Sequence, residues 1–245
     1  MSVSPAEIDR ATIATWPAAE TEMRDGWALL ASGGVTGRVN AVWPLEWRGG
    51  DLEAAIDAAE AWYAARHLPP RFKLTDGAFA PAELPQALAQ RGYEAITPTL
   101  IMSAPIAPRM AAEDVLLSTA MPAEFDAVLR AVSKDDAEYD ERHAIALRAP
   151  QPAAFAMIAR EGRAAAIGMA AATGPLAGIF LMRTAPEARR QGLARGILTA
   201  LLARSAEWGV RTAFLQVEAD NASAIALYQS EGFEALSTYC FWSRP

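Results

Sequence analysis

The chain carries an internal repeat, which favours folds that can be built from two copies of one supersecondary unit. Residues 91–105 (RGYEAITPTLIMSAP) match residues 231–245 (EGFEALSTYCFWSRP) at a constant offset of 140 positions. Upstream, residues 72–75 (FKLT) match residues 214–217 (FLQV) at an offset of 142. Both copies predict the same succession of helix, strand, turn, helix, Gly-aromatic pair and strand. The aligned pairs include Gly92 with Gly232, Tyr93 with Phe233, Glu94 with Glu234, Ala95 with Ala235 and Pro105 with Pro245.

The repeat also predicts where the chain divides. Glycine commonly follows a helix, so two unrelated helix–Gly–strand endings are the alternative explanation. The unbroken register over fifteen residues favours duplication instead. Because the second copy ends at the last residue, we expect one domain over residues 1–105 and another over residues 106–245, with a linker at residues 104–112.

The second half alternates strands with helices. Strands are expected at residues 114–119, 153–161, 164–172, 177–183 and 212–217, with a last strand ending near Phe241. Helices are expected at residues 122–133, 191–208 and 222–230, and a short one follows the acidic residues 135–141. In the helix at 191–208, one face carries a stripe with the 3.6-residue period of an amphipathic helix: Leu193, Ile197, Leu198, Leu201 and Leu202. This order predicts an α/β or α+β layer structure.

Composition excludes several classes of protein. Hydrophobic residues make up 52% of the 245 residues and charged residues 21%, so the chain can bury a core and is not disordered. A net charge of −7 argues against a general nucleic-acid binder. One cysteine, Cys240, excludes an internal disulfide, and with only His67 and His143 beside it the usual Cys/His zinc sites are excluded, so no metal is expected. We therefore expect a cytoplasmic protein.

No targeting or membrane segment is expected. The N-terminus has acidic residues near its start and no apolar core, unlike a signal peptide. Residues 164–182 carry no charge and are long enough for a membrane span. The Thr173-Gly174-Pro175 turn in their middle favours two short buried strands.

One segment combines a glycine with arginines at the start of a helix, directly after a buried strand. It contains Arg189, Arg190, Gln191, Gly192, Leu193, Ala194 and Arg195. Free amides and a partial positive charge at a helix start can hold a phosphate, and a glycine lets the backbone approach it. Arginine suits phosphate geometry. Taken alone, the segment is equally explained by a strand-to-helix turn with solvated arginines.

Residues that follow this segment in the chain distinguish between the two explanations. About thirty positions on, Asn221, Ala224 and Tyr228 open a helix that ends at Gly232-Phe233. Over residues 114–245 the chain resembles the GNAT acyltransferase superfamily, whose pattern is Arg/Gln-x-x-Gly-x-Gly/Ala, then Asn-x-x-Ala, x-x-x-Tyr and Gly-Phe. Ala194 stands where glycine is more usual in that family. The resemblance implies two GNAT-like domains, each a mixed, mostly antiparallel sheet flanked by helices.

The resemblance also implies the roles of individual residues. Acetyl-CoA, with no metal, would lie where the strand at 177–184 splays from the strand at 212–217. Backbone groups around Arg183, from Met182 and Thr184, would bond the pantetheine arm, and the amides of residues 191–195 would hold the pyrophosphate beside Arg189 and Arg190. Asn221 would bond the cofactor arm, and Tyr228 would protonate the departing thiolate. A plain helix N-cap is the alternative for Asn221, and ring packing is the alternative for Tyr228.

The base that deprotonates the amine is left open. The strand at 177–183 has no carboxylate, so Glu218, Asp220 or a water chain are the candidates. The acidic residues Asp135, Asp136, Glu138, Asp140 and Glu141 would suit a cationic amine as a rim of the acceptor site. A solvated helix start explains them slightly better. Cys240 is expected to be a small buried residue, and His67 and His143 lie in no motif.

The first copy lacks the functional residues. Leu88 corresponds to Tyr228, and residues 47–52 (WRGGDL) place Asp51 where a phosphate would sit. We expect a degenerate first domain, and five of the seven tryptophans fall within it, so some should pack on the second domain.

The predicted activity is acetyl transfer from acetyl-CoA to a primary amine, on a small molecule or peptide, by direct attack in a ternary complex. Transfer of another acyl group and a CoA-binding sensor without turnover are the alternatives. No nucleic-acid or membrane partner is expected, and the oligomeric state is left open, a monomer being compatible with two domains packed together.

Overall fold

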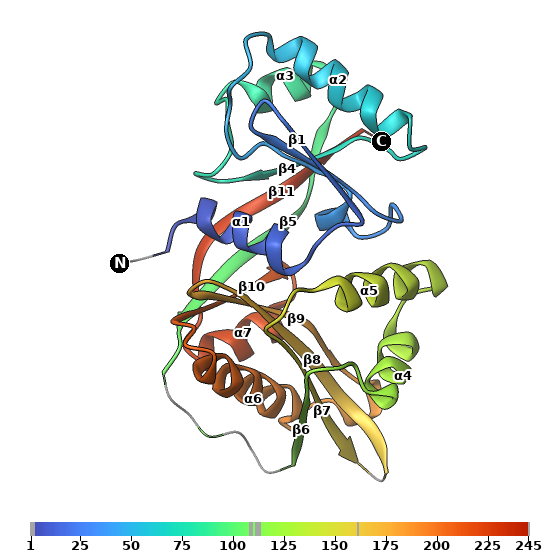
Figure 1. Ribbon diagram of the computed structural model, residues 1–245, viewed down its shortest axis with the longest axis vertical. Helices are drawn as coiled ribbons and strands as arrows, with labels where there is room; N and C mark the ends of the chain where they lie inside the picture. The colour runs from blue at the N-terminus through green and yellow to red at the C-terminus, as the bar shows by residue number, and fades with distance from the viewer. Residues whose placement is uncertain (1–2, 108–109, 111–113, 161, 245) are drawn as a thin grey trace.

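The computed structural model describes residues 3–107, 110, 114–160 and 162–244, and its strands form one sheet (Figure 1). Eleven strands lie in the order β1-β2-β3-β4-β11-β5-β10-β9-β8-β7-β6. Among the described strands, only β3 with β4 and β9 with β10 pair in parallel, so the sheet is mixed and mostly antiparallel, as expected. The strands are β1 (Glu20–Arg24), β2 (Trp27–Ala31), β3 (Val42–Trp43), β4 (Arg71–Thr75), β5 (Glu94–Pro105), β6 (Val115–Ser118), β7 (Ala153–Arg160), β8 (Arg163–Thr173), β9 (Leu176–Thr184), β10 (Thr212–Glu218) and β11 (Glu234–Ser243).

Seven α-helices and two short 3-10 helices are described around this sheet. They are α1 (Pro5–Thr15), η1 (Gly37–Val39), α2 (Leu52–Ala64), α3 (Leu84–Gln90), α4 (Ala123–Val132), α5 (Asp136–Arg148), η2 (Pro186–Ala188), α6 (Leu193–Glu207) and α7 (Ala222–Ser230). The elements expected in the second half are all present, with ends displaced by a few residues. The exception is the short helix expected after the acidic residues 135–141, because α5 begins within them at Asp136 and runs for 13 residues.

The last strands of the two repeats lie side by side across the middle of the molecule. β5, which ends the first repeat, lies between β11 and β10, and β11, which ends the second, lies between β4 and β5 (Figure 1). Their register is symmetric, because Glu234 is opposite Ser103 and Ser243 is opposite Glu94. Each half thus contributes its final strand to the edge of the other half. The division near residue 105 stays a prediction, and part of the linker, at residues 108–109 and 111–113, falls outside the described residues.

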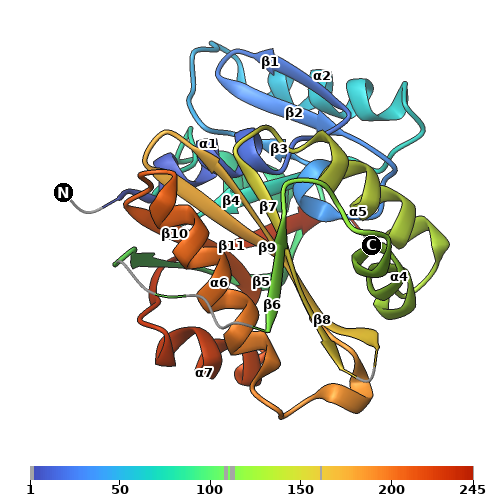
Figure 2. The same ribbon diagram turned by 60° about the horizontal axis from the view of Figure 1, so that its bottom comes forward.

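Both faces of the sheet in the C-terminal half are covered by helices, as the alternation of side chains along its strands requires. On β7, Phe155 and Met157 belong to the cluster under α1, α4 and α5, whereas Ala156 and Ile158 belong to the cluster under α6 and α7. Figure 2 shows these two groups of helices on opposite sides of the strands. The five residues expected to form the stripe of α6 are all buried.

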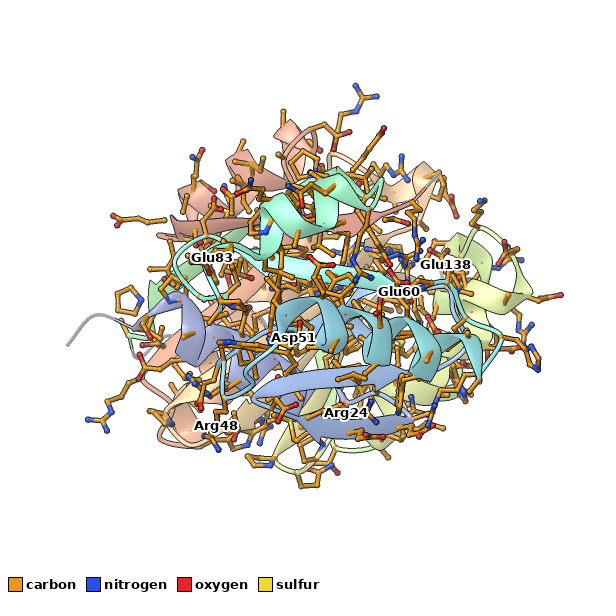
Figure 3. The ribbon with its side chains drawn as sticks, turned by 90° about the horizontal axis from the view of Figure 1, so that it is seen from above. Arg24, Arg48, Asp51, Glu60, Glu83 and Glu138 are labelled. Carbon is orange, nitrogen blue, oxygen red and sulfur yellow. The ribbon has the colours of Figure 1, made fainter. Side chains whose placement is uncertain are left out.

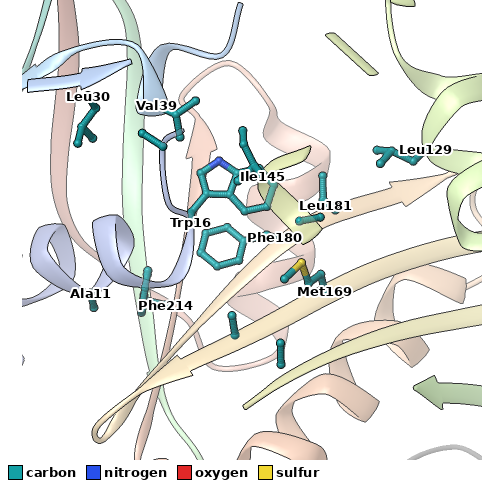
Figure 4. Packing of buried hydrophobic residues seen from close by; sticks show 14 of the residues in the cluster. Ala11, Trp16, Leu30, Val39, Leu129, Ile145, Met169, Phe180, Leu181 and Phe214 are labelled. Atoms are coloured by element: carbon teal, nitrogen blue, oxygen red, sulfur yellow. The ribbon is translucent and has the colours of Figure 1, made fainter. Parts of the chain in front are cut away.

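One apolar cluster spans the two halves. Trp16, which follows α1, stacks on Phe180 of β9 with ring centroids 4.8 Å apart (Figure 4). Trp43 of β3 belongs to the same cluster, which also includes Phe125 and Phe214 of the second half. The expectation that some tryptophans of the first half pack on the second is therefore confirmed. The apolar core is therefore continuous across the junction of the two halves.

The uncharged segment at residues 164–182 forms parts of two paired strands. β8 and β9 are antiparallel and nearly all of their side chains are buried. Gly174, with a φ of +52°, makes the turn between them, a conformation that glycine adopts without a steric cost. Within the described part of the chain, no helix has both the length and the apolar character that crossing a membrane requires.

Candidate active site

Two neighbouring strands separate partway along their length and open a cavity between them. β9 and β10 pair only through Leu176–Gly178 and Thr212–Phe214. Beyond these residues, β9 from Ile179 to Arg183 and β10 from Leu215 to Glu218 line a cavity of about 660 Å³. Residues of α5, α7, β4, β5, β11 and the loop around η1 complete its wall. The cavity lies where the sequence predicted that these two strands would splay.

An irregularity in β9 shapes this wall. The pairing of β9 with β8 shifts between Ile167 and Met169, so that Leu181 and Met182 lie opposite the single residue Gly168. Leu181 has a φ of +51°, which is unusual for a residue with a side chain and marks a strained bulge. Bulges redirect the groups that follow them. Here Met182 belongs to the bulge and Thr184 follows it, and the backbone of these two residues was expected to bond the pantetheine arm.

The start of α6 presents backbone donors. Gly192 is its N-cap residue, with a φ of +76°, and Arg190 also has a positive φ, of +61°. The first recorded donor of the helix is Gly196, which donates to the Gly192 carbonyl at 3.2 Å. For Leu193, Ala194 and Arg195 the described structure records no acceptor for the amide N–H. Such free amides at a helix start form an anion site together with the helix dipole.

The side chains of residues 189–195 differ in exposure and in their partners, although the sequence predicted one phosphate-binding role for the segment. Arg189, Arg190 and Gln191 are exposed, and Leu193 is buried in the core, so only its backbone can face a ligand. Arg195 donates to Ser230 at 2.9 Å and forms a 3.0 Å ion pair with Glu231. None of residues 189–195 lines the cavity. The segment and the cavity are therefore separate regions that one extended ligand would have to bridge.

Tyr228 of α7 lies on the cavity wall. The residue is 8% exposed, and its ring is 6.0 Å from that of Phe233. No hydrogen bond of its hydroxyl is recorded within the described residues. Burial raises the pKa of Tyr228, partly offset by the positive charge of Arg183. The hydroxyl therefore stays protonated at neutral pH and can donate a proton into the cavity.

Three further site residues were expected in and after β10. Asn221 and Glu218 line the cavity, and Asp220 does not. Asn221 caps α7 by accepting the amide of Ala224 at 3.2 Å, as the N-cap explanation requires, and it also lines the cavity. Glu218, a candidate base, lines the cavity at the end of β10, whereas Asp220 is not part of its lining. Glu218 is thus the better placed of the two carboxylates.

The acidic residues at the start of α5 have three different surroundings. Asp135 is the N-cap and accepts the amide of Glu138 at 2.8 Å. Glu138 lines the cavity and forms a 2.8 Å ion pair with Arg142 (Figure 3 labels Glu138 on α5). Glu141 is buried and binds the N-terminal half. It accepts from the amides of Val35 and Thr36 and from the side chain of Asn40 at 2.8 Å. The preference for a purely solvated helix start was therefore wrong for Glu138 and Glu141.

Of the arginines on the cavity wall, Arg183 was among the expected site residues, whereas Arg38, Arg71 and Arg142 were missed in the sequence. Arg38 and Arg142 line the cavity together with Arg71 and Arg183. Burial, and next the like charge of Arg183, lowers the pKa of Arg142 to about 10. Arg38 and Arg71 lie in the N-terminal half, and no local pattern signals that their side chains meet those of α5 and β9. Only the tertiary packing of the two halves brings them together.

The N-terminal counterparts of the site residues have other surroundings. Asp51 caps α2 by accepting the amide of Ala54 at 3.1 Å, so a carboxylate occupies the helix start there (Figure 3). Leu88, the counterpart of Tyr228, is fully buried in the core of that half. A cavity of only about 10 Å³ lies between Trp27, Trp47 and α2.

Comparisons with known proteins agree with this geometry. The model of the family described as "Probable histone acetyltransferase Rv0428c C-terminal" matches residues 6–241, which is nearly the whole chain. The chain belongs to this family of GNAT acetyltransferases. The "Uncharacterized N-acetyltransferase YobR" of Bacillus subtilis (strain 168) is 26% identical over 243 residues, covering 95% of this chain and 96% of that protein.

Partial relatives add to the family assignment. The "[Ribosomal protein bS18]-alanine N-acetyltransferase" of Escherichia coli (strain K12) is 38% identical over 76 residues, which cover 31% of this chain and 51% of that enzyme. The chain thus matches about half the length of this relative. Together with the family model, these relatives place the chain among the N-acetyltransferases of the GNAT type.

Solved structures share the fold of this acetyltransferase over its full length. A GCN5-related N-acetyltransferase from Kribbella flavida superposes with a TM-score of 0.72 at 15% identity, covering 100% of this chain and 97% of that one. A tandem GNAT protein from the clavulanic acid biosynthesis pathway superposes with a TM-score of 0.59 at 18% identity, covering 99% and 88%. At these identities the likeness concerns the fold, and it agrees with the tandem arrangement that the repeat predicted. Within the described ranges, the acetyltransferase has no cluster of three or more His, Cys, Asp or Glu residues that could hold a metal ion.

Proposed function

We propose that this acetyltransferase moves an acetyl group from acetyl-CoA to a primary amine in a ternary complex. The observation that carries the proposal is the divergence of β9 from β10, with Tyr228 on the wall of the resulting cavity. The GNAT fold implies acetyl-CoA as the co-substrate. The residues present fit this group, because a cleft lined by free strand edges and a helix start with free amides are both available.

The donor would be held at two places. The amides of residues 191–195 at the start of α6 would bind the pyrophosphate, helped by the nearby charges of Arg189 and Arg190. The backbone of Met182, within the bulge in β9, and of Thr184, after it, would bond the pantetheine arm. Asn221 would reach the same arm from the other side of the cavity.

Bound acetyl-CoA supplies an activated acyl carbon. As the amine attacks it, a C–N bond forms, the C–S bond breaks, and negative charge develops on the carbonyl oxygen, where backbone N–H donors of β9 would stabilise it. The Tyr228 hydroxyl would donate its proton to the sulfur. Glu218, directly or through water, would accept the proton that the amine must lose, since amines of the lysine type have a pKa of ~10.4.

Release of free thiol from acetyl-CoA across a panel of amines tests the proposal, and donors with longer acyl chains test whether acetyl is the preferred group. In parallel, we expect Gly192→Glu to abolish acetyl-CoA binding. A side chain at a φ of +76° is strained, and its carboxylate would repel the pyrophosphate. Calorimetry with a folded Gly192→Glu variant checks this, and unchanged affinity would contradict the assigned phosphate site.

A further inference from the structure

The cavity is positively charged in a chain that is negative overall. Four arginines and two glutamates are the charged residues on its wall, whereas the whole chain has a net charge of −7. A site for a plain cationic amine would be expected to carry the opposite sign. The positive charge of this wall is therefore not what a plain cationic amine would need.

Three of these arginines are close enough to affect each other's ionisation. Burial lowers the pKa of Arg183, and the charge of Arg38 lowers it further, while Glu138 opposes both. Arg142 is affected in the same way by Arg183 and Arg38. Only Arg142 has a carboxylate partner, Glu138, at 2.8 Å. Within the described residues, Arg38 and Arg183 form no ion pair, so the cluster holds uncompensated positive charge.

The cluster lies apart from the expected phosphate site. Arg38 belongs to η1, Arg142 to α5, and Arg183 to the end of β9, and all three line the cavity. The start of α6, where the pyrophosphate is expected, contributes no residue to that wall. The arginines therefore do not duplicate the donor's phosphate site.

The loop that carries Arg38 is held in place by a buried network. The Asn40 side chain accepts from the amide of Ser32 at 2.7 Å and from that of Gly34 at 3.0 Å, and it donates to the Thr36 carbonyl at 2.9 Å. Glu141 accepts from the same loop and from Asn40. A loop fixed in this way presents its arginine at little entropic cost, which is the condition for a preorganised binding site.

Unsatisfied polar atoms cluster around the same cavity. Five buried side-chain N or O atoms have no hydrogen-bond partner within the described residues, and four of these belong to residues of the cavity wall: Trp16, Thr36, Arg71 and Gln216. Native structures leave few such atoms without partners. Their concentration around this cavity indicates that the cavity binds a ligand with polar groups, which would supply the missing hydrogen-bond partners.

We infer that the amine acceptor carries an anionic oxygen group, a carboxylate or a phosphate, which Arg38, Arg142 and Arg183 bind while the amine faces the donor. The inference rests on the proposed function and deepens it by naming the acceptor's chemical class. Guanidinium groups match such oxyanions with paired hydrogen bonds. The Glu138 carboxylate, already bonded to Arg142, then serves to orient that arginine.

Matched acceptors test the inference. We compare ω-amino acids of increasing length with their neutral amides, with ω-aminoalkylphosphonates and with diamines, following thiol release from acetyl-CoA. We expect at least a tenfold higher kcat/KM for the best anionic acceptor than for its amide. The carboxylate and phosphonate arms decide which oxyanion fits. Equal or higher kcat/KM for the amides or diamines would overturn the inference while leaving the acetyltransferase activity in place.

Variants separate acceptor binding from donor binding. We expect Arg38→Gln to raise the KM for the anionic acceptor roughly 10- to 100-fold, as the loss of a charge-assisted contact predicts, with the KM for acetyl-CoA unchanged. Arg142→Gln should act in the same way. Arg148→Gln, an exposed residue of the same helix, is the matched control and should leave both constants unchanged. An Arg38→Gln enzyme that retains the wild-type preference for anions would overturn the inference.

A binding measurement keeps the inference testable if no acceptor in the panel releases thiol. That result would count against the proposed function alone. Calorimetry with the same amino acids and phosphonates, without acetyl-CoA, then asks whether the cavity binds them. Binding to the wild type that Arg38→Gln abolishes would support the anion site, and absence of binding to the wild type would overturn it.

Discussion

At the scale of single residues, Tyr228 is the group whose removal tests the chemistry most directly. Tyr228→Phe retains the buried ring and removes the hydroxyl. If that hydroxyl protonates the thiolate, turnover should fall by about 10²–10⁴-fold. The affinity for acetyl-CoA should hardly change, because the lost interaction belongs to the transition state. Steady-state kinetics with calorimetry checks both, and wild-type turnover in Tyr228→Phe, with chemistry rate-limiting, would show that the tyrosine only packs.

The pKa of the same residue predicts the pH profile. Burial raises the pKa of Tyr228 above its ordinary value of 10.0, so the hydroxyl keeps its proton throughout the neutral range. Loss of this acid therefore cannot cause a decline of kcat/KM below pH 10. The rise on the acidic side, which reports the base and the amine, should survive in Tyr228→Phe with the same midpoint.

A buried ion pair gives a second prediction at this scale, for stability. Lys73 of β4 donates to Asp9 of α1 at 2.8 Å and to Thr75, with its ammonium 4.0 Å from the ring centroids of both Trp43 and Tyr239. Asp9→Asn would leave this ammonium buried without its counter-charge. We expect the free energy of unfolding in urea to fall by about 3–5 kcal/mol.

The pH dependence distinguishes this cause from simple loss of packing. Burial already lowers the pKa of Lys73, and Asp9, which opposes this, would be gone in Asp9→Asn. The unfolded state then binds more protons than the folded state between the two pKa values, so the stability of the variant should rise with pH. Ala11→Gly on the same helix is the control and should show no such added slope. A destabilisation of Asp9→Asn that is constant up to pH 10 would contradict the ionic explanation.

At the scale of secondary-structure elements, α5 connects the two halves through Glu141. Glu141→Ala would leave two backbone amides and the Asn40 side chain without their acceptor. We expect the free energy of unfolding to fall by about 3 kcal/mol, because buried donors lose a charged partner. The KM for the acceptor should also rise, since the loop that carries Arg38 is no longer fixed. Arg148→Gln serves again as the control on this helix, and an unchanged KM in a folded Glu141→Ala enzyme would show that the loop is held by other contacts.

Helix α5 also shows which property of an element the sequence pattern does not predict, namely the surroundings of its side chains. The 3.6-residue period of α6 and the order of glycine, asparagine and tyrosine around it are local, so that helix, the loop before it and Tyr228 could be predicted. The environment of α5 depends on which surface lies above it. Asp135 obeys the local rule for a helix cap, whereas Glu141, six residues on, binds a loop about a hundred positions away in the sequence. Nothing local distinguishes these two carboxylates.

At the scale of the whole molecule, the order of the strands in the sheet could not be predicted from the sequence. The repeat predicts that the strands ending at Pro105 and Pro245 are equivalent, and their pairing is indeed symmetric. The side-chain pattern of a strand records which face is buried but not which strand lies beside it. The exchange of β5 and β11 between the halves, and with it the positions of Arg38 and Arg71, follows from tertiary packing alone.

This exchange sharpens the prediction that the N-terminal half is structurally required. In a fragment of residues 106–245, β10 and β11 would both lose β5, and Phe180 would lose the ring of Trp16. The unpaired strand edges and the exposed apolar face should make the fragment insoluble or nearly inactive.

The control keeps both halves and cuts only the connection between them. A protease site placed within residues 107–112 should allow cleavage after folding, and the two pieces should stay associated because β5 remains between β10 and β11. Size-exclusion chromatography and the thiol-release assay compare the cut chain with the isolated fragment. We expect the cut chain to elute as one species with most of its activity. A soluble, monomeric fragment of residues 106–245 with full activity would show that the C-terminal half completes its own sheet, and that the exchanged strand is dispensable.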